Sequence, residues 1–244
     1  LSLPKIKNSI MKKLSLFCLT LNPEHEKIIK DLSLIPVGLG NKKFPLGFFT
    51  DKQNENISIK NPFYGEYTFH YWIWKNYIDK INSEWIGFCQ YRKFFVLKKV
   101  NVNNLSLNEL KKNLLTNLND EFKNYDCILG EKFSVENFKN TKILKKHLFH
   151  FLKSPKALFF KKNRTLLFHF DLFHGKGNLE KAIDLLDSNN RNEFRKFVKN
   201  NTSFNPHNMF ICRTKLLKSY YCSVFPWLKK CEKIFGFNNL EGYG

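Results

Sequence analysis

The 244-residue sequence lacks the short motifs that would assign it directly to a class of site. It contains no Cys-x-x-Cys pair, no Gly-x-Gly-x-x-Gly fingerprint, no P-loop and no nucleophile elbow. These absences argue against a zinc ribbon, a dithiol redox site, a dinucleotide fold and an α/β-hydrolase. Asp-x-Asp is also missing, so no metal site is assigned. The sequence neither requires nor rules out Mn²⁺ or Mg²⁺ as a cofactor.

Long apolar runs are missing as well. No stretch of about 18 consecutive apolar residues exists, so we predict no membrane-spanning helix. The apolar residues 14–21 stop at Asn22-Pro23 without a small-residue cleavage site, so they indicate a buried strand rather than a signal peptide. The six cysteines lie mostly in apolar runs, as core thiols do, which favours a reducing cytoplasm.

Acidic residues are scarce, since 21 Asp and Glu face 41 Lys and Arg, and the formal net charge is +20. Such a balance favours anionic partners, namely nucleic acid, acidic lipid or phosphorylated substrates. Residues 139–165 carry no acid, and Phe residues alternate there with Lys. This pattern suits an interfacial segment on anionic lipid, although single-stranded nucleic acid or a solvated face would also fit. Because the Phe residues lie among Leu residues, we expect a membrane surface and no nucleic acid.

The residues that are present predict an α/β fold. Apolar runs predict strands at 14–21, 84–91, 125–130 and 207–213. Periodic apolar residues predict helices at 66–81, 105–124, 178–200 and 215–237, with a kink or a break at Pro226. Strands that alternate with helices indicate a sheet whose carboxyl ends hold the ligand.

The strand predicted at 84–91 ends in an unusual way, on Gln90, Tyr91, Arg92 and Lys93. The guanidinium group offers a planar fork of donors that matches phosphate oxygens. These side chains therefore form a candidate site for an anionic ligand. The alternative is that Arg92 and Lys93 are simply solvated at the exit of a strand.

Two further groups of polar residues remain open. Asn56, Ser58 and Asn61 precede the helix at 66–81, where they would bind a base or ribose, or act as turn and capping residues. Four histidines lie close together in the sequence, but acidic or cysteine partners at ligand spacing are missing. We therefore assign no zinc site to His147, His150, His169 and His174.

Many of these residues together resemble a family of glycosyltransferase-like domains that is encoded in bacterial capsule and O-antigen clusters. The matching positions are Asp51, 56–58, Asn61, Glu66, Thr68, Tyr71, Trp72, 74–76, 85–87, 91–93 and Phe95, with looser matches at 125–130, His174, 208–210 and 221–222. Three features depart from the family pattern. Gln90 stands in place of a His and Lys93 in place of an Arg, residues 139–165 look like an insertion, and the family continues past the Gly-Tyr at 242–243.

The resemblance implies a GT-A-like fold with a mixed central sheet flanked by helices. We expect a single domain over 1–244 that is truncated at its C-terminus. The expected activity is transfer of a sugar, hexosyl or galactofuranosyl, from a UDP donor to capsular polysaccharide, O-antigen or a lipid-linked acceptor. The enzyme would be cytoplasmic and peripheral on the inner membrane, with 139–165 on anionic lipid.

The resemblance also suggests roles for individual residues. Some transferases of this fold place Asp-x-Asp where 90–93 lie, so the cations here would neutralise the donor diphosphate themselves. The expected donor-binding residues are Asn56, Ser58, Asn61, Glu66, Lys75, Asn76, Tyr91, Arg92 and Lys93. Asp126 and His174 are the catalytic candidates. The alternative function is a non-catalytic basic module that binds membrane or nucleic acid within a polysaccharide-assembly protein.

Overall fold

The computed structural model describes residues 12–136 and 160–237, and it divides into two compact units. Unit 1 comprises Leu1–Gly130 and His207–Tyr221, and unit 2 comprises Glu131–Pro206 and Cys222–Gly244. Both units are discontinuous in sequence, and the long helix α10 (Thr214–Phe235) contributes residues to each. Most of the basic segment 139–165 lies outside the described residues. The expectation of a single domain stays a prediction.

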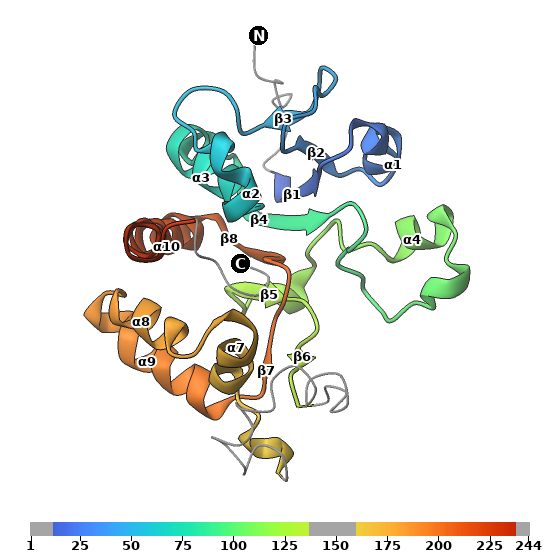
Figure 1. Ribbon diagram of the computed structural model, residues 1–244. Coiled ribbons are helices and arrows are strands. Elements are labelled where there is room, and N and C mark those ends of the chain that lie inside the picture. Colours follow the sequence, from blue (N-terminus) through green and yellow to red (C-terminus); the bar gives the residue numbers. More distant parts are fainter. Residues whose placement is uncertain (1–11, 137–159, 238–244) are drawn as a thin grey trace. The chain divides into compact units, whose positions relative to one another are not determined.

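Unit 1 is built on a six-stranded sheet with the order β3-β2-β1-β4-β8-β5 (Figure 1). The strands are β1 (Lys12–Thr20), β2 (Ile35–Gly38), β3 (Phe49–Thr50), β4 (Ser83–Gln90), β5 (Cys127–Leu129) and β8 (Phe210–Arg213). The first four strands are parallel to one another, whereas β8 runs antiparallel to both of its neighbours. The predicted mixed sheet flanked by helices is therefore confirmed.

Helices cover both faces of this sheet, which explains why β1 is apolar without alternation (Figure 1). On one face, Leu14, Leu16 and Cys18 pack into a cluster with apolar residues in and next to two helices, α1 (Glu26–Asp31) and α4 (Leu107–Asn113). On the other face, Phe17 meets Phe69 of α3 (Tyr67–Asn76), with ring centroids 5.6 Å apart. The helices on the two faces thus pack the sheet into a rigid core, and the carboxyl ends of its parallel strands lie together at one edge.

The predicted helix 105–124 is wrong in its second half. Its first part forms α4, which a capping box between Ser106 and Glu109 begins. The chain then turns, because Leu114 forms a β-bridge with Val96 and Leu115 donates its N–H to Phe95 O. Only a 3-10 turn, Asp120–Phe122, follows. A contact with a distant segment thus replaces the local helical hydrogen bonds.

Unit 2 combines a short β-ribbon with a helical cluster. The ribbon pairs β6 (Phe133–Ser134) with β7 (Ser203–Phe204). The helices are α7 (Leu166–His174), α8 (Asn178–Asp184), α9 (Ser188–Asn200) and the second part of α10. The predicted helix 178–200 is interrupted because Asp187 caps α9, accepting the N–H of Asn190 at 3.0 Å.

The predicted kink or break at Pro226 does not divide α10, which is assigned as one helix on both sides of the proline. Within the described ranges, no helix is apolar over enough of its length to cross a bilayer. The described residues also contain short elements. They are α2 (Asn61–Tyr64) and the 3-10 turns Pro23–His25, Ser58–Lys60, Ile78–Lys80, Val102–Asn104 and Lys161–Asn163.

Candidate functional site

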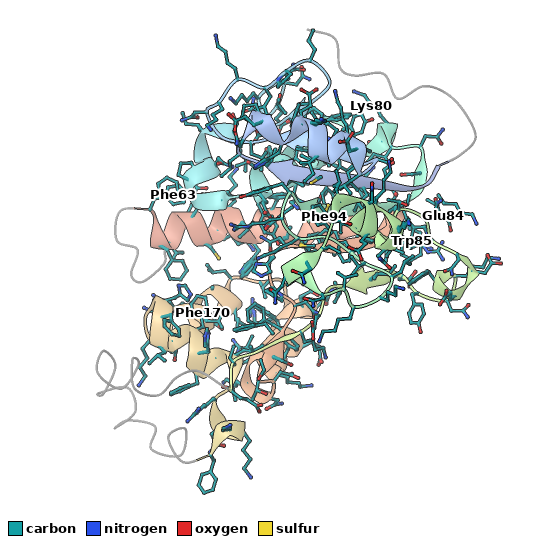
Figure 2. All side chains as sticks on the ribbon, turned by 90° about the vertical axis from the view of Figure 1, so that its right-hand side faces the viewer. Phe63, Lys80, Glu84, Trp85, Phe94 and Phe170 are labelled. Carbon is teal, nitrogen blue, oxygen red and sulfur yellow. The ribbon has the colours of Figure 1, made fainter. Side chains whose placement is uncertain are left out.

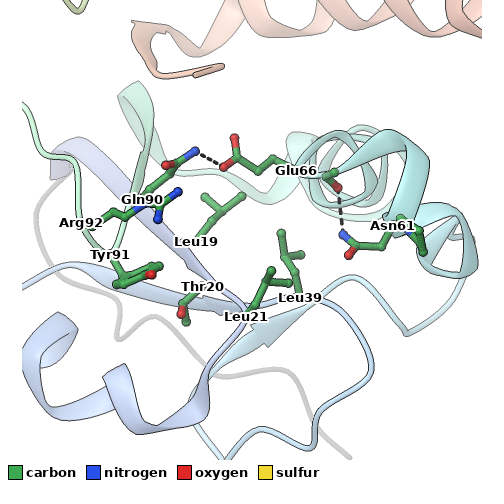
Figure 3. Close-up of a pocket in the computed structure, with 11 residues that line it drawn as sticks. Leu19, Thr20, Leu21, Leu39, Asn61, Glu66, Gln90, Tyr91 and Arg92 are labelled. Carbon is green, nitrogen blue, oxygen red and sulfur yellow. Dashed lines mark hydrogen bonds between the residues drawn. The ribbon is translucent and has the colours of Figure 1, made fainter. Parts of the chain in front are cut away.

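A pocket of about 390 Å³ opens at the carboxyl edge of the parallel strands of unit 1 (Figure 3). Its volume is in the range of ordinary small-molecule sites. The lining residues come from the ends of β1 and β4, from the residue after β2, and from the segment around α2. They are Leu19, Thr20, Leu21, Leu39, Asn61, Pro62, Gly65, Glu66, Gln90, Tyr91 and Arg92.

The register of the sheet brings these segments together. In the parallel pairing, Leu19 of β1 lies beside Val37 of β2 on one side and beside Gln90 of β4 on the other. The chain therefore leaves all three strands at the same edge, which is where open α/β sheets bind ligands. Tyr91 extends this edge by one residue, because its N–H donates to Leu19 O at 3.2 Å.

Two polar walls face each other across an apolar floor (Figure 3). Glu66, on one wall, accepts a hydrogen bond from Nε2 of Gln90 on the other. Burial raises the pKa of the Glu66 carboxyl, while the hydrogen bond from Gln90 and the nearby cations Lys93 and Arg92 act in the opposite direction. The Glu66 carboxyl, whose pKa is raised, thus lines the same pocket as the guanidinium group of Arg92.

The Tyr91 ring is held by a short chain of contacts. It stacks on the imidazole of His25, with centroids 4.0 Å apart and planes 20° apart. Nδ1 of that imidazole lies 2.7 Å from Oγ1 of Thr20, at the end of β1. The guanidinium of Arg92 lies 5.8 Å from the Tyr91 ring centroid, and Arg92 itself is exposed and lines the pocket.

Asn61 ties the α2 segment to the start of α3. Its Nδ2 donates to Gly65 O at 2.9 Å and to Thr68 Oγ1 at 3.2 Å. Both of these bonds use the amide nitrogen of Asn61, whereas its side-chain carbonyl oxygen is an acceptor group. Of the polar triplet before the helix, Asn61 is therefore the member that lines the pocket.

Lys93 lies beside the pocket rather than in its wall. Its Nζ is 2.7 Å from Nε2 of His207, in the segment that leads into β8. His207 and the next residue, Asn208, have positive φ values of 77° and 51°, a conformation that costs free energy in residues other than glycine. The pKa of His207 is lowered by burial and by the positive charges of Lys93 and Arg92. Beside the predicted cations Arg92 and Lys93 thus lies a histidine that the sequence analysis missed.

Several predicted donor-binding residues make contacts away from the lining. The Asn56 side chain closes a turn, because its Oδ1 accepts from Ser58 N at 3.2 Å and from Ser58 Oγ at 2.8 Å. Lys75 Nζ lies 3.4 Å from Glu55, and Asn76 Nδ2 donates to Glu55 O at 2.8 Å. These four residues brace the loop before α2, and their roles toward a donor stay predictions.

The two catalytic candidates are not among the lining residues either. Asp126 is exposed and immediately precedes β5, where its carbonyl oxygen accepts the N–H of Arg213 at 3.0 Å. His174 ends α7 in unit 2, and burial lowers its pKa. Their catalytic roles stay predictions. In the described parts of the chain, no group of three or more His, Cys, Asp or Glu side chains is arranged to hold a metal ion.

Sequence reasoning also missed other residues of this region, among them Thr20, Leu21, His25 and Leu39. The signal that identified 90–93, a polar side chain at the end of a buried strand, was also present at Thr20. Leu39 follows β2 in the same way, but a lone leucine after a strand carries no chemical signal. His25 is recognisable only through its contact with Tyr91 in the folded chain.

Comparison with known proteins places the chain in a family. The family described as domain of unknown function DUF4422 matches residues 21–244. The chain belongs to this family. None of the curated proteins matches this DUF4422 chain.

The DUF4422 chain is similar to a solved structure, the bifunctional glycosyltransferase WbbM in its apo form. The TM-score is 0.61 at 19% sequence identity, over 93% of this chain. The matched region is 38% of the WbbM chain, so the protein described here corresponds to about two fifths of that enzyme. At this identity the similarity shows a shared fold, and that fold occurs in a glycosyltransferase.

Proposed function

We propose that the protein is a glycosyltransferase that binds a UDP-sugar in the pocket at the carboxyl edge of β1 and β4. The sugar, hexosyl or galactofuranosyl, would pass to a capsular polysaccharide, an O-antigen or a lipid-linked acceptor. The observation that carries this proposal is the position of Arg92 in the pocket wall, opposite Glu66 and above an apolar floor. The fold shared with part of WbbM supports it.

In the proposed complex, Arg92 binds the diphosphate, and Lys93 adds a second positive charge from its position beside His207. A guanidinium pairs with phosphate oxygens through two parallel hydrogen bonds. When the bond between the anomeric carbon and the phosphate oxygen breaks, the electron pair stays on the diphosphate. Fixed cations stabilise that developing charge. Tyr91, stacked on His25, and Asn61 would contact the nucleoside or the sugar.

Glu66 is the carboxylate that we favour as the acceptor's base. It is the acid that lines the pocket, and Gln90 orients it. The acceptor hydroxyl would form the new glycosidic bond to the anomeric carbon, while its proton moves to the Glu66 carboxylate. Because burial raises the pKa of this carboxyl, it is a stronger base than an exposed glutamate.

Titration with UDP and UDP-sugars tests the proposal, monitored by thermal shift and by calorimetry, with and without manganese. We expect the melting temperature to rise with UDP. Arg92→Ala should weaken UDP binding by roughly 10- to 100-fold, in line with the loss of a charged hydrogen bond. Arg92→Lys should recover part of the loss, because the charge returns without the fork.

Lys98→Ala is the matched control, since Lys98 is an exposed cation further along the same segment and does not line the pocket. If UDP binding were equal in wild type, Arg92→Ala and Lys98→Ala, the proposed role of Arg92 would be wrong. If instead no nucleotide bound and arbitrary nucleic acid bound with steep salt dependence, the non-catalytic basic module would be favoured.

A further inference from the structure

The mouth of the pocket is bordered by exposed apolar side chains. Leu21, which lines the pocket, is 58% exposed, and Ile59 and Phe63, on either side of the lining residues Asn61 and Pro62, are 88% and 48% exposed. Figure 2 shows Phe63 at the surface of the α2 segment. Exposed apolar side chains that gather beside a binding site, rather than single ones, mark an interaction surface.

The segments that carry these side chains lie together in space. A Cβ atom built on Gly40 would come within 3.1 Å of Leu21 Cδ2 and 3.7 Å of Asn61 Oδ1, so the loop after β2 runs between the two. Lys42 Nζ lies 3.5 Å from Oδ1 of Asn22, the residue after Leu21. The loop after β2 therefore links the segment of Leu21 to the segment of Asn61 on this side of the pocket.

The charged residues of these segments are all basic. Residues 21–22, 39–43 and 59–63 contain Lys42, Lys43 and Lys60 and no acid. We define the mouth rim as Leu21, Lys42, Lys43, Ile59, Lys60 and Phe63. Aliphatic side chains with lysines beside them match the boundary of an anionic bilayer, where the apolar groups enter the acyl region and the ammonium groups meet the headgroups. Base-stacking surfaces use flat aromatic rings, whereas two of the three apolar side chains of the rim, Leu21 and Ile59, are aliphatic.

We propose that the mouth rim docks on an anionic lipid bilayer, with the pocket opening toward the membrane surface. The occupant of the rim is the lipid bilayer itself. Where the protein acts as proposed above, this orientation delivers a lipid-linked acceptor directly to Glu66; only this last step rests on the proposed function. The rim is distinct from the basic segment 139–165, which the sequence analysis assigned to the membrane.

Vesicle flotation of the full chain tests the proposal. The vesicles contain phosphatidylcholine alone or phosphatidylcholine mixed with phosphatidylglycerol. The variant Ile59→Ser/Phe63→Ser should lower the partition coefficient on the anionic vesicles by at least about tenfold, the effect expected for one large apolar side chain that no longer leaves water. Lys42→Gln/Lys43→Gln should reduce binding to the anionic vesicles but not to neutral ones.

The control variant is Leu97→Ser/Val102→Ser. These two side chains are 60% and 76% exposed and belong to the segment between β4 and α4. Residues 139–165 are identical in all variants, so their contribution to vesicle binding cancels. We expect the control to bind within twofold of wild type.

The proposal is wrong if wild type does not bind anionic vesicles, or if the rim variant and the control bind equally. It is also wrong if the rim variant loses binding to single-stranded nucleic acid or to a protein partner while vesicle binding is unchanged. UDP-induced thermal shift, measured on every variant, separates this result from the proposed function. If a rim variant no longer binds vesicles but still responds to UDP, its donor site is intact and the docking proposal is supported. If wild type shows no response to UDP, only the proposed donor site is wrong.

Discussion

Glu66 combines three properties that few surface glutamates share. It lines a pocket, it is held by an amide from the opposite wall, and its pKa is raised by burial. A raised pKa means that the folded protein keeps this proton up to a higher pH than the unfolded chain does. The carboxylate form, which a base requires, is therefore complete only above that shifted value.

Replacing Glu66 by Gln should lower kcat for sugar transfer by roughly 10²- to 10⁴-fold, the range for loss of a general base. UDP binding should change little, because the Gln amide oxygen still accepts from Gln90. In wild type, the acid limb of the pH–rate profile should lie above the ordinary Glu value of 4.5, since burial raises the pKa. Glu131→Gln, at an exposed site, is the control and should keep wild-type kcat. An unchanged kcat in Glu66→Gln would remove Glu66 from the chemistry.

At the scale of elements, β4 is the strand on which the site depends most. It pairs with β1 on one side and β8 on the other, and Gln90 ends it. Gly87 lies at its centre, where a Cβ atom would come within 2.7 Å of both Ile211 Cγ1 and Leu16 Cδ1. The glycine thus allows neighbouring side chains to fill the space above the strand.

Gly87→Ala should destabilise the protein by about 1–3 kcal/mol, because the added methyl group overpacks a buried sheet. Urea unfolding measures this change. Gly130→Ala is the matched control, since no heavy atom lies within 4 Å of the position that its added methyl group would take, and the expected effect is within about 0.5 kcal/mol. Equal stabilities of the two variants would contradict the packing described for β4.

The elements that the sequence predicted well are those whose pattern is local. The runs at β1 and β4 and the periodicity of α3 are complete within a few residues, and all three elements form in the expected regions, although α3 ends at Asn76 rather than at 81. The second half of the helix expected over 105–124 does not form, because the backbone of Leu114 and Leu115 pairs with residues 95–96 instead. No local sequence pattern reveals this pairing.

The residues of the site also divide into those that a local sequence pattern predicts and those that it does not. Tyr91 and Arg92 were predicted because polar residues after a buried strand mark the ligand edge of a sheet, and both line the pocket. Asn61 and Glu66 were expected from their position before a helix and from the family resemblance. His207 was missed, because it reaches Lys93 only after β8 has paired with β4, and that pairing links residues far apart in the sequence.

At the scale of the whole molecule, the buried His70 makes stability depend on pH. Its Nδ1 lies 2.7 Å from the Tyr221 hydroxyl, and complete burial lowers its pKa to about 3. In the unfolded chain the same imidazole has its ordinary pKa of 6.5. The unfolded state therefore binds one more proton than the folded state between these two values, and stability falls as the pH falls.

Between pH 6.5 and pH 5, this group alone should lower the free energy of unfolding by about 2 kcal/mol. His70→Gln, although less stable at pH 7, should show a correspondingly smaller loss over that interval in urea unfolding. His207→Gln should reduce the dependence on pH less than His70→Gln does, because His207 is exposed and far less buried than His70. If wild type and His70→Gln had parallel stability curves from pH 7 to pH 5, His70 would not be the responsible group.

The pairing of β4 with β8 also constrains how the protein is made. Residues 91–209, which include all of the first stretch of unit 2, are translated between these two neighbouring strands. At about 5–20 residues per second, the ribosome needs roughly 6–24 s to add them. During that interval the backbone amides along one side of β4 have no strand to pair with, and such open edges attract other chains. We expect the nascent chain to depend on chaperones until β8 emerges.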